Sequence, residues 1–418
     1  MKRKRRTDKA RLEVTGLTAR GAGEAEHDGQ PVVVRGALPG ELVEARIDGR
    51  HATVASVITT HPQRVEPACP IADRCGGCDW MHASLTFQRE AQEAMWRAQL
   101  EAHWDGPLTL HEVGPPLGYR CRARLAVQAR KGVRIGYRRA RSHQLVELGA
   151  CPILRPELEA AIPELRDALA GSRGDGEAAL ALGAGAAPVL DLRFAGELDG
   201  AVFGRIHDAV QAGRWAGARV WDGDVAKPAT FGDPRPRVEA ADGASLVIAP
   251  GGFSQPSLEA GRVLSAHVAK VVPPSNEVVE LFAGSGTLTV ALRAGPLREA
   301  SDYLVVEEVA DARAALLENL DRRDLPAVRF HVGDANDVSL PRGLPLVVLD
   351  PPRRGAAGAI AAIAEARVKR VAYVSCDPVS LARDLAALGD AYRCVAAEAF
   401  RLFPQTHHLE TVVLLERR

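Results

Sequence analysis

The spacing of apolar residues changes character along this chain of 418 residues. Between residues 11 and 60, short valine-rich segments alternate with glycines, a pattern typical of strands joined by tight turns. It predicts strands at 30–34, 41–47 and 51–58, the second of which alternates with a period of two. Several short strands in so short a stretch predict a small antiparallel barrel, an architecture common among oligonucleotide-binding proteins.

The middle of the chain is patterned less clearly. Residues 82–104 carry apolar side chains at helical spacing and predict a helix. A turn near Lys131-Gly132 predicts a hairpin between strands at about 120–125 and 133–137. Residues 156–247 show weak alternation and no catalytic pattern, so we interpret them as scaffold. Within this scaffold we expect strands at 189–194, 201–203 and 218–221 and a helix at 205–212.

Beyond residue 250, short apolar segments alternate with helical patterns, which favours a parallel sheet in an α/β domain. The expected strands are 278–282, 303–306, 328–332, 346–349, 371–374 and 411–415. In open sheets of this kind, ligands bind in the crevice at the carboxyl ends of the strands. Candidate chemistry is therefore sought where these strands end.

Composition and charge limit the class of protein without choosing a function. The chain has 53 Lys or Arg residues and 53 Asp or Glu residues, so its net charge does not indicate a class of binding partner. No apolar run is long enough to cross a bilayer, and the basic run 2–6 has no apolar segment behind it, as a secretory signal would. We expect a cytoplasmic protein whose residues 1–10 form a disordered basic arm, for solubility or for contact with phosphates.

Seven cysteines in a large intracellular chain favour metal or catalytic roles over disulfides. Cys69, Cys75 and Cys78 lie close together in a loop that could wrap one metal centre, and Cys151, which precedes a proline, is the natural fourth ligand. Such a set suits an iron–sulfur cluster or a structural zinc. The spacing leaves both open.

The predicted hairpin is strongly basic. Between residues 119 and 141 the sequence has nine Lys or Arg residues and no acid: Arg120, Arg122, Arg124, Arg130, Lys131, Arg134, Arg138, Arg139 and Arg141. Alternation along the first strand would place guanidinium groups on one face, where they match phosphate oxygens. A solvated charged face is the alternative.

A cofactor pocket is indicated at the first strands of the parallel sheet. Gly284 and Gly286 let the backbone approach a ligand at a helix N-terminus, and Glu307 ends the next strand, where an acid suits ribose hydroxyls. The third glycine of a dinucleotide site and a Gly-Lys-Ser/Thr motif are both missing. An adenosine ligand without pyrophosphate is favoured, which indicates S-adenosylmethionine. Asp334 is positioned to meet adenine, and prolines after Asp350 aim its carboxylate into the crevice.

Cys376 ends the strand expected at 371–374 and precedes Asp377-Pro378. A cysteine at that position is a candidate nucleophile, although free cysteines are also frequent as small buried apolar residues. The surrounding motifs decide between these interpretations.

These motifs together resemble the RNA uracil-5-methyltransferases, and among them the branch that modifies 23S ribosomal RNA and carries an iron–sulfur cluster. The resemblance covers almost the whole chain. The motifs that carry it are Phe253-x-Gln255, Glu280-Leu281-Phe282-Ala283-Gly284-x-Gly286, Asp350-Pro351-Pro352-Arg353, Ser375-Cys376-Asp377-Pro378 and Phe403-Pro404-x-Thr406-x-x-Leu409-Glu410.

The resemblance implies a fold and a domain order. A TRAM-like β-barrel at 11–61 would bind RNA, and an α+β domain at 62–249 would carry the iron–sulfur loop and the basic hairpin. A Rossmann-like methyltransferase domain would occupy 250–418, with the helix at 82–104 free to pack on it. We expect a monomer whose partner is RNA, 23S rRNA above all.

The resemblance also implies residue roles. Cys376 is the expected nucleophile and Glu410 the expected base. The four ligands of a 4Fe-4S cluster are expected to be Cys69, Cys75, Cys78 and Cys151. The residues expected to bind S-adenosylmethionine are Gln255, Phe282, Thr287, Glu307, Asp334 and Asp350.

Two positions depart from the family pattern. The usual Asn after the cysteine is Asp377, and the usual Asn two residues after Gln255 is Ser257. An inward-pointing Asp377 carboxylate would raise the pKa of Cys376, which affects rate more than identity. The alternatives to rRNA uracil methylation are a tRNA uracil-5-methyltransferase, an RNA cytosine-5-methyltransferase, and a non-catalytic RNA-binding factor on the same fold.

Overall fold

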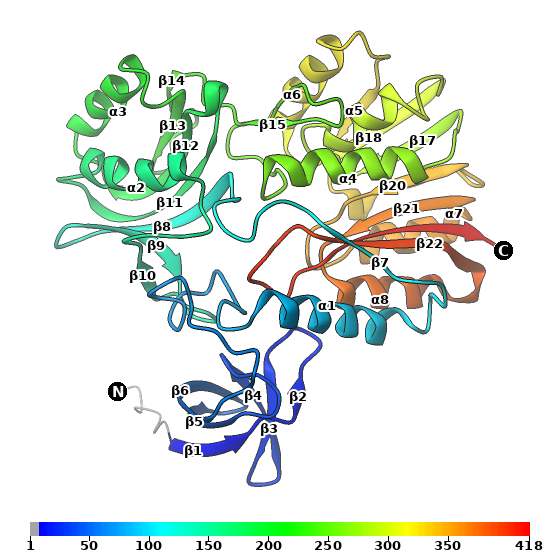
Figure 1. Cartoon of the computed structure of the whole chain (residues 1–418). Coiled ribbons are helices and arrows are strands. Elements are labelled where there is room, and N and C mark those ends of the chain that lie inside the picture. Colours follow the sequence, from blue (N-terminus) through cyan, green and yellow to red (C-terminus); the bar gives the residue numbers. More distant parts are fainter. Residues whose placement is uncertain (1–7) are drawn as a thin grey trace.

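The computed structural model describes residues 8–418, which form three lobes: a small one below and two larger ones side by side (Figure 1). The small lobe is a six-stranded sheet with strand order β1-β5-β6-β4-β3-β2. Its strands are β1 Asp8–Glu13, β2 Gly16–Leu17, β3 Gly23–His27, β4 Gln30–Arg35, β5 Leu42–Asp48 and β6 His51–Thr59. The strands expected at 30–34, 41–47 and 51–58 are β4, β5 and β6, and their alternating side chains bury a small apolar core.

The basic arm expected at 1–10 needs a correction at its end. Its residues 1–7, with the basic run 2–6, lie outside the described residues. Lys9 and Ala10 already belong to β1, where they pair antiparallel with Arg46 and Ala45 of β5. The ladder pairing orders this part of the chain, so residues 8–10 do not belong to a disordered arm.

The central lobe is a seven-stranded sheet with order β10-β9-β8-β11-β12-β13-β14. Its strands are β8 Arg122–Ala129, β9 Val133–Arg138, β10 Leu145–Glu147, β11 Arg173–Leu182, β12 Pro188–Glu197, β13 Gly217–Asp222 and β14 Ala229–Gly232. Helices α2 Pro156–Ala168 and α3 Ala201–Gln211 supply apolar residues to the same core as the sheet, and η1 Ala184–Ala186 is a short turn. The predicted hairpin is β8–β9, with Gly132 in its turn at a φ of 115°.

The strand expected at 201–203 was wrong. These residues are the first turn of α3, in which Val202, Ile206 and Ala209 are buried at intervals of four and three. The helical spacing thus joins the expected strand at 201–203 and the expected helix at 205–212 into one helix. Tertiary burial of one face therefore outweighs the local β preference of Val202 and Phe203.

The third lobe contains an eight-stranded sheet with order β19-β18-β17-β20-β21-β23-β22-β7. The strands are β17 Glu277–Leu281, β18 Asp302–Glu307, β19 Arg329–Val332, β20 Leu346–Leu349, β21 Arg370–Ser375, β22 Tyr392–Arg401, β23 Glu410–Arg417 and β7 Thr109–Glu112. Strands β17 to β21 are parallel, whereas β23 runs antiparallel to both β21 and β22. The chain crosses from β19 past β17 to β20, so a crevice is expected where β17 and β20 end.

Helices cover both faces of this sheet. They are α1 Leu85–Leu100, α4 Leu258–Val271, α5 Thr287–Ala294, α6 Ala310–Asp321, α7 Ala357–Ala366 and α8 Pro378–Leu388, with short turns η2 Ala335–Asp337 and η3 Gly389–Ala391. Successive strand residues enter different cores: Val278 packs with α4, α5 and α6, and Val279 packs with α1, α7 and α8. Strands buried on both sides explain the continuous apolar runs of the sequence. A two-stranded ribbon, β15 Arg237–Glu239 with β16 Ser245–Val247, precedes α4.

Two N-terminal elements complete the third lobe. Helix α1, capped by Ser84, buries Trp96 and Leu100 in the core beside α8, and β7 pairs in parallel with β22 at the sheet edge (Figure 1). The expected boundary at residue 249 therefore does not separate the two larger sheets. None of the helices in residues 8–418 has the length and apolar character needed to span a bilayer.

Candidate active site

One cavity of about 480 Å³ opens at the carboxyl ends of the parallel strands. Its wall contains seven of the eight residues expected to catalyse the reaction or to bind S-adenosylmethionine: Gln255, Phe282, Glu307, Asp334, Asp350, Cys376 and Glu410. Thr287 is not part of the wall; it is the first residue of α5, behind the glycine turn. Strand ends from one edge of the sheet thus bring together residues far apart in the sequence.

The turn after β17 is shaped for a close ligand approach. Phe282 and Gly284 have φ angles of 60° and 55°, and Gly286 has a φ of 88°. A positive φ costs a bulky residue such as Phe282 free energy, which is typical of ligand sites. The Glu307 carboxylate accepts hydrogen bonds from the backbone N–H groups of Gly284 and Val309, both at 2.9 Å. The acid at the end of β18 is therefore held against the glycine turn.

Two further polar residues line the same cavity. Asp334 is exposed and caps the turn η2, accepting a hydrogen bond from the N–H of Asn336 at 2.8 Å, which lowers the pKa of its carboxyl. Gln255 is buried, and its Oε1 has no hydrogen-bond partner among the described residues. An unpaired buried acceptor is costly, so Gln255 is suited to a ligand that supplies a donor. The nearby departure Ser257 has a local role as the N-cap of α4, accepting from Ala260.

Three acids lie at or beside this cavity: Glu280 and Glu410 are buried, and Asp350 is half-buried. Burial, and then the charge of Glu280, raises the pKa of Asp350, while burial raises the pKa of Glu280 to about 7 although Tyr303 donates a hydrogen bond to it at 2.6 Å. Burial and the charge of Asp350 raise the pKa of Glu410 well above its usual range. Within residues 8–418, Oε2 of Glu410 has no hydrogen-bond partner. The site therefore concentrates acceptors that a bound cation or donor would stabilise.

Cys376 follows β21 and is partly buried. Burial raises the pKa of its thiol, the charges of Glu410 and Asp350 raise it further, and Arg353 opposes them. These effects together favour the neutral thiol over the thiolate. A thiolate is the nucleophilic form, so a positive charge brought by a ligand would be needed to activate it.

The departure Asp377 has its own partners. One carboxylate oxygen caps α8, accepting from the N–H of Val379 at 2.9 Å, and the other accepts from Arg20 of the small lobe at 3.2 Å. Its charge raises the pKa of Cys376 less than Glu410 and Asp350 do. This contact could not be expected from the sequence, because Arg20 and Asp377 are 357 residues apart.

The loop before Glu410 is fixed by two glutamines of α1. The Gln88 side chain donates to Oε1 of Gln405 at 3.0 Å and accepts from its N–H at 3.0 Å, and Gln92 donates to the carbonyl oxygens of Thr406 and His408, each at 3.0 Å. Both glutamines are buried. The sequence analysis treated this helix as an apolar stripe and missed both glutamines. Their spacing of four residues, which places them on one face of the helix, was the signal that could have identified them.

Four cysteines surround a second, small apolar cavity: Cys69, Cys75, Cys78 and Cys151. None is in a disulfide. Burial raises the pKa of Cys78 to about 12 and that of Cys151 to about 11. Arg35 of the small lobe donates hydrogen bonds to the carbonyl oxygens of Cys75 and Cys78, at 2.5 and 3.2 Å. Four thiols around one cavity are a complete donor set for one tetrahedral metal or one cluster.

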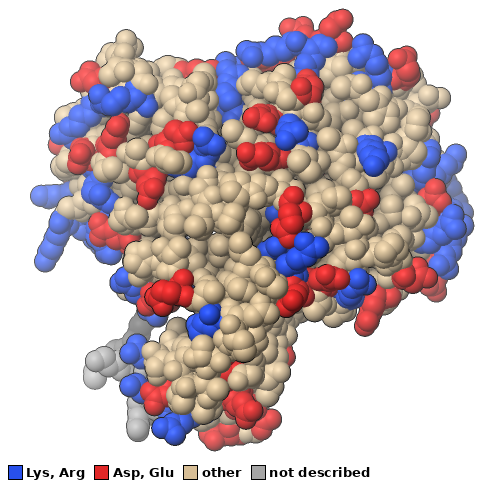
Figure 2. All heavy atoms as spheres, in the orientation of Figure 1, with Lys and Arg blue, Asp and Glu red and all other residues tan. Residues whose placement is uncertain are grey.

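The basic hairpin is more neutral than its sequence indicated. Its neighbouring strands supply the missing acids: Glu177 and Asp175 of β11 pair with Arg124 and Arg130, each at 2.7 Å. On the face shown in Figure 2, basic and acidic side chains are likewise interspersed. Three arginines still reach the large cavity wall: Arg120, Arg122 and Arg124. At the same wall Phe253 is 63% exposed, with the Arg122 guanidinium 4.9 Å from its ring centroid.

Comparisons with known proteins agree with this architecture. The family model of the tRNA (uracil-5-)-methyltransferases matches residues 342–418. The 23S rRNA (uracil(1939)-C(5))-methyltransferase RlmD of Pectobacterium carotovorum subsp. carotovorum is 35% identical over 425 residues, covering 96% of this chain and 92% of its own. The protein of the same name from Alkalilimnicola ehrlichii is 32% identical over 457 residues, covering 100% and 99%.

A solved structure shares the fold over nearly the whole length. The Pyrococcus abyssi tRNA (uracil-54, C5)-methyltransferase in complex with S-adenosyl-L-homocysteine superposes with a TM-score of 0.74 at 19% identity, covering 97% of this chain and 100% of that one. The fold is therefore the Rossmann-like fold of a methyltransferase. The chain belongs to the RNA uracil-5-methyltransferase family.

The ion pair between Arg20 and Asp377 should influence the reactivity of the Cys376 thiol. Arg20→Ala leaves the Asp377 charge uncompensated beside Cys376, so the pKa of the thiol should rise and its alkylation at fixed pH should slow. The effect should be at most about fivefold, the range of a partly exposed ion pair. Alkylation of the Cys376 peptide by iodoacetamide, followed by mass spectrometry across pH, measures it.

A double-mutant cycle separates this effect from a general loss of structure. Asp377→Asn should speed alkylation of Cys376, and adding Arg20→Ala to it should then change nothing further. Arg50→Ala, which removes an exposed arginine of the same lobe, serves as the control. Equal slowing by Arg20→Ala with and without Asp377 would show that the ion pair has no influence on the thiol.

Proposed function

We propose that this protein transfers a methyl group from S-adenosylmethionine to C5 of a specific uridine in 23S ribosomal RNA. The observation that carries the proposal is the common wall of the cavity, where Cys376, Glu410 and Asp350 lie together with the carboxylate of Glu307. The choice of 23S rRNA is supported by the names of the two relatives that match nearly the whole chain.

Uracil chemistry explains the need for a thiol and a carboxylate. C5 of uracil is a poor nucleophile, and addition of the Cys376 thiolate to C6 converts the ring to an enolate with electron density at C5. C5 then takes the methyl group of the sulfonium. The Glu410 carboxylate removes the C5 proton, and the released electron pair re-forms the C5–C6 double bond and expels the thiolate. A raised pKa makes Glu410 a stronger base for this step.

For S-adenosylmethionine we propose the six residues named from the family pattern: Gln255, Phe282, Thr287, Glu307, Asp334 and Asp350. The ligand supplies an activated methyl group and a positive sulfonium. Glu307 would accept from the ribose hydroxyls and Asp334 would meet the adenine. Gln255 would accept a hydrogen bond from the ligand through its unpaired, buried Oε1, and the half-buried Asp350 carboxylate would attract the positive sulfonium. Thr287 does not line the cavity, so it would support the cofactor indirectly, as the first residue of α5 behind the glycine turn.

RNA contact is proposed for the small lobe, as a TRAM-like domain, and for the β8–β9 hairpin. The target base must leave its stack to reach Cys376, which costs a few kcal/mol. The exposed Phe253 ring with Arg122 over it offers a stacking surface at the cavity, where bases can be held. We further propose a cytoplasmic monomer.

For the four cysteines we propose a 4Fe-4S cluster rather than zinc. The reaction needs no electron transfer, so its role would be structural. The hydrogen bonds of Arg35 to the loop support this role, because they join the cluster segment to the small lobe.

A mechanism-based trap tests the reaction. Incubation with S-adenosylmethionine and 23S rRNA fragments containing 5-fluorouridine should give a stable covalent complex, because fluorine at C5 cannot be removed as a proton. Cys376→Ala should abolish it and Cys394→Ser should not. Fragments of 23S rRNA are compared with tRNA and with 5-fluorocytidine RNA. Trapping only with tRNA or cytidine would establish the corresponding alternative, and no trapping with any RNA would contradict the methyltransferase reaction.

Glu410→Gln tests the base. Without removal of the C5 proton the thiolate cannot be expelled, so this variant should accumulate a methylated, covalent RNA–protein complex with ordinary uridine. Denaturing gel electrophoresis with methyl-labelled cofactor measures it. Glu416→Gln, at the other end of β23, is the control. Release of free 5-methyluridine by Glu410→Gln at the native rate would assign the base to another group.

The cluster has a separate test. Protein purified without air should be brown and contain about four irons and four sulfides per chain. Cys78→Ser should lose them, and Cys394→Ser, in β22, should keep them. Colourless protein with one zinc per chain would refute the cluster and favour a zinc site.

A further inference from the structure

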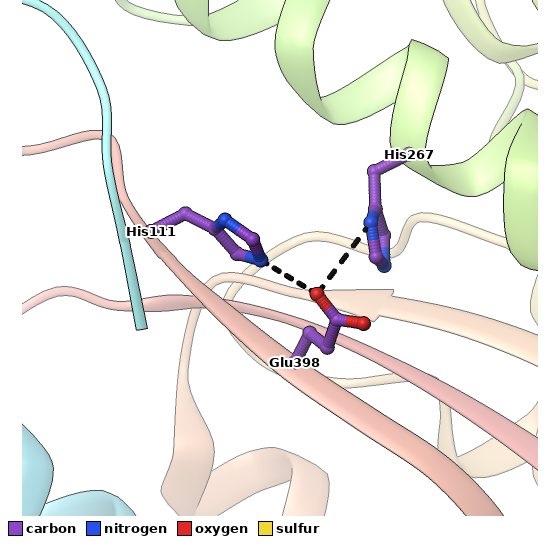
Figure 3. A group of neighbouring side chains, drawn as sticks. All are labelled: His111, His267 and Glu398. Carbon is purple, nitrogen blue, oxygen red and sulfur yellow. Dashed lines mark hydrogen bonds and ion pairs between the residues drawn. The ribbon is translucent and has the colours of Figure 1, made fainter. Parts of the chain in front are cut away.

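Three side chains outside the catalytic cavity meet at the β7 edge of the eight-stranded sheet (Figure 3). His111 comes from β7, Glu398 from β22 and His267 from α4. Nε2 of His111 lies 2.5 Å from Oε2 of Glu398, and Nδ1 of His267 lies 3.7 Å from the same oxygen. One potential ligand atom from each residue falls within 4.8 Å of the other two.

The surrounding packing holds both imidazoles toward Glu398. In the parallel pairing of β22 with β7, Phe400 lies opposite His111, and the two rings stack with centroids 4.5 Å apart and 14° between their planes. His267 packs edge-on against the same phenyl ring at 4.9 Å. Phe400 is fully buried. The donor atoms are therefore positioned by a rigid core residue rather than by exposed, freely rotating side chains.

Hydrogen bonding explains the position of His111 beside Glu398 but not that of His267. The separation of His267 from Glu398 exceeds hydrogen-bond distance, although both face the same space in Figure 3. Two imidazoles and one carboxylate are a common donor set for zinc, with bonds of about 2.0–2.2 Å. A tetrahedral ion at such distances needs ligand atoms roughly 3.3–3.5 Å apart. The observed 2.5 and 3.7 Å bracket that spacing, so small side-chain rotations would admit an ion.

Solvent can reach the group. The side chains of His111 and Glu398 are 37% and 31% exposed, whereas that of His267 is 11% exposed. An ion can therefore enter from the β7 side and keep water on its remaining coordination position. Lys270, one turn farther along α4, is exposed as well.

We propose that His111, His267 and Glu398 form a structural binding site for a divalent cation of the zinc type. Such an ion joins three elements from different parts of the chain: β7, α4 and β22. Strand β22 continues into the loop before Glu410, so the ion would brace the strand from which that loop starts. The proposal concerns neither the methyl transfer nor the four cysteines.

Metal binding to the native protein with its cysteine-bound metal centre intact tests the proposal. Equilibrium dialysis against Zn²⁺, followed by metal analysis, should give one additional zinc per chain with a Kd below about 10 µM. His267→Ala and Glu398→Gln should each weaken binding at least about 100-fold, since even outer-shell partners contribute 10–100-fold. His207→Ala, on α3 of the central lobe, should bind like the native protein.

Two readouts locate the ion and guard against misfolded variants. Co²⁺ bound in place of Zn²⁺ should show ligand-field absorption without a thiolate charge-transfer band. Zn²⁺ should raise the thermal unfolding midpoint of the native protein and of His207→Ala but not of Glu398→Gln, which preserves side-chain size. The absence of an additional zinc with a Kd below about 10 µM, a cobalt–thiolate band, or undiminished binding by both ligand variants would overturn the proposal.

Discussion

The catalytic half depends on the anchoring of one buried loop by a helix from the other half. Gln92 of α1 illustrates this: its amide donates to two loop carbonyls and its Oε1 accepts from Arg401 of β22 at 2.6 Å. Arg401 also pairs with Glu112 of β7 at 2.6 Å. A typical hydrogen bond contributes only about 1 kcal/mol net, but a buried group left unpaired costs about 1–3 kcal/mol. The network is therefore favourable only when helix, loop and edge strand are all in place, and Glu410 directly follows this loop.

That constraint explains why the lobes do not divide at a simple boundary. A chain lacking residues 85–112 would lose α1 and β7, and with them the partners of Gln405, Thr406 and Arg401. The segment that follows the cysteine loop is attached to the same loop before Glu410. The backbone N–H groups of Asp79 and Trp80 both donate hydrogen bonds to the carbonyl oxygen of Gln405. The segments proposed to hold RNA are thus connected, through this loop, to Glu410, the residue proposed to remove the C5 proton.

Sequence reasoning succeeded where the determinant is local. Strands such as β20 are continuous apolar runs because both sheet faces are covered, and their ends converge at one edge. That is why Asp350 and Cys376 could be expected in one cavity. It failed where a partner lies far along the chain. Strand β7 has four residues of mixed polarity, and its partner in the sheet comes almost at the end of the sequence. The acids that pair with the hairpin arginines likewise come from β11.

The charge of Asp377 beside Cys376 has partners of its own in the structure. An aspartate in place of asparagine adds a charge next to a thiol that Glu410 and Asp350 already disfavour as thiolate. The structure compensates that charge in part, because one carboxylate oxygen caps α8 and the other accepts a hydrogen bond from Arg20. Because Arg20 belongs to the small lobe, the pairing also ties the position of that lobe to the electrostatics of the Cys376 thiol. The aspartate is thus compensated by an interaction between lobes, and a local reading of the Ser-Cys-Asp-Pro motif misses its consequence.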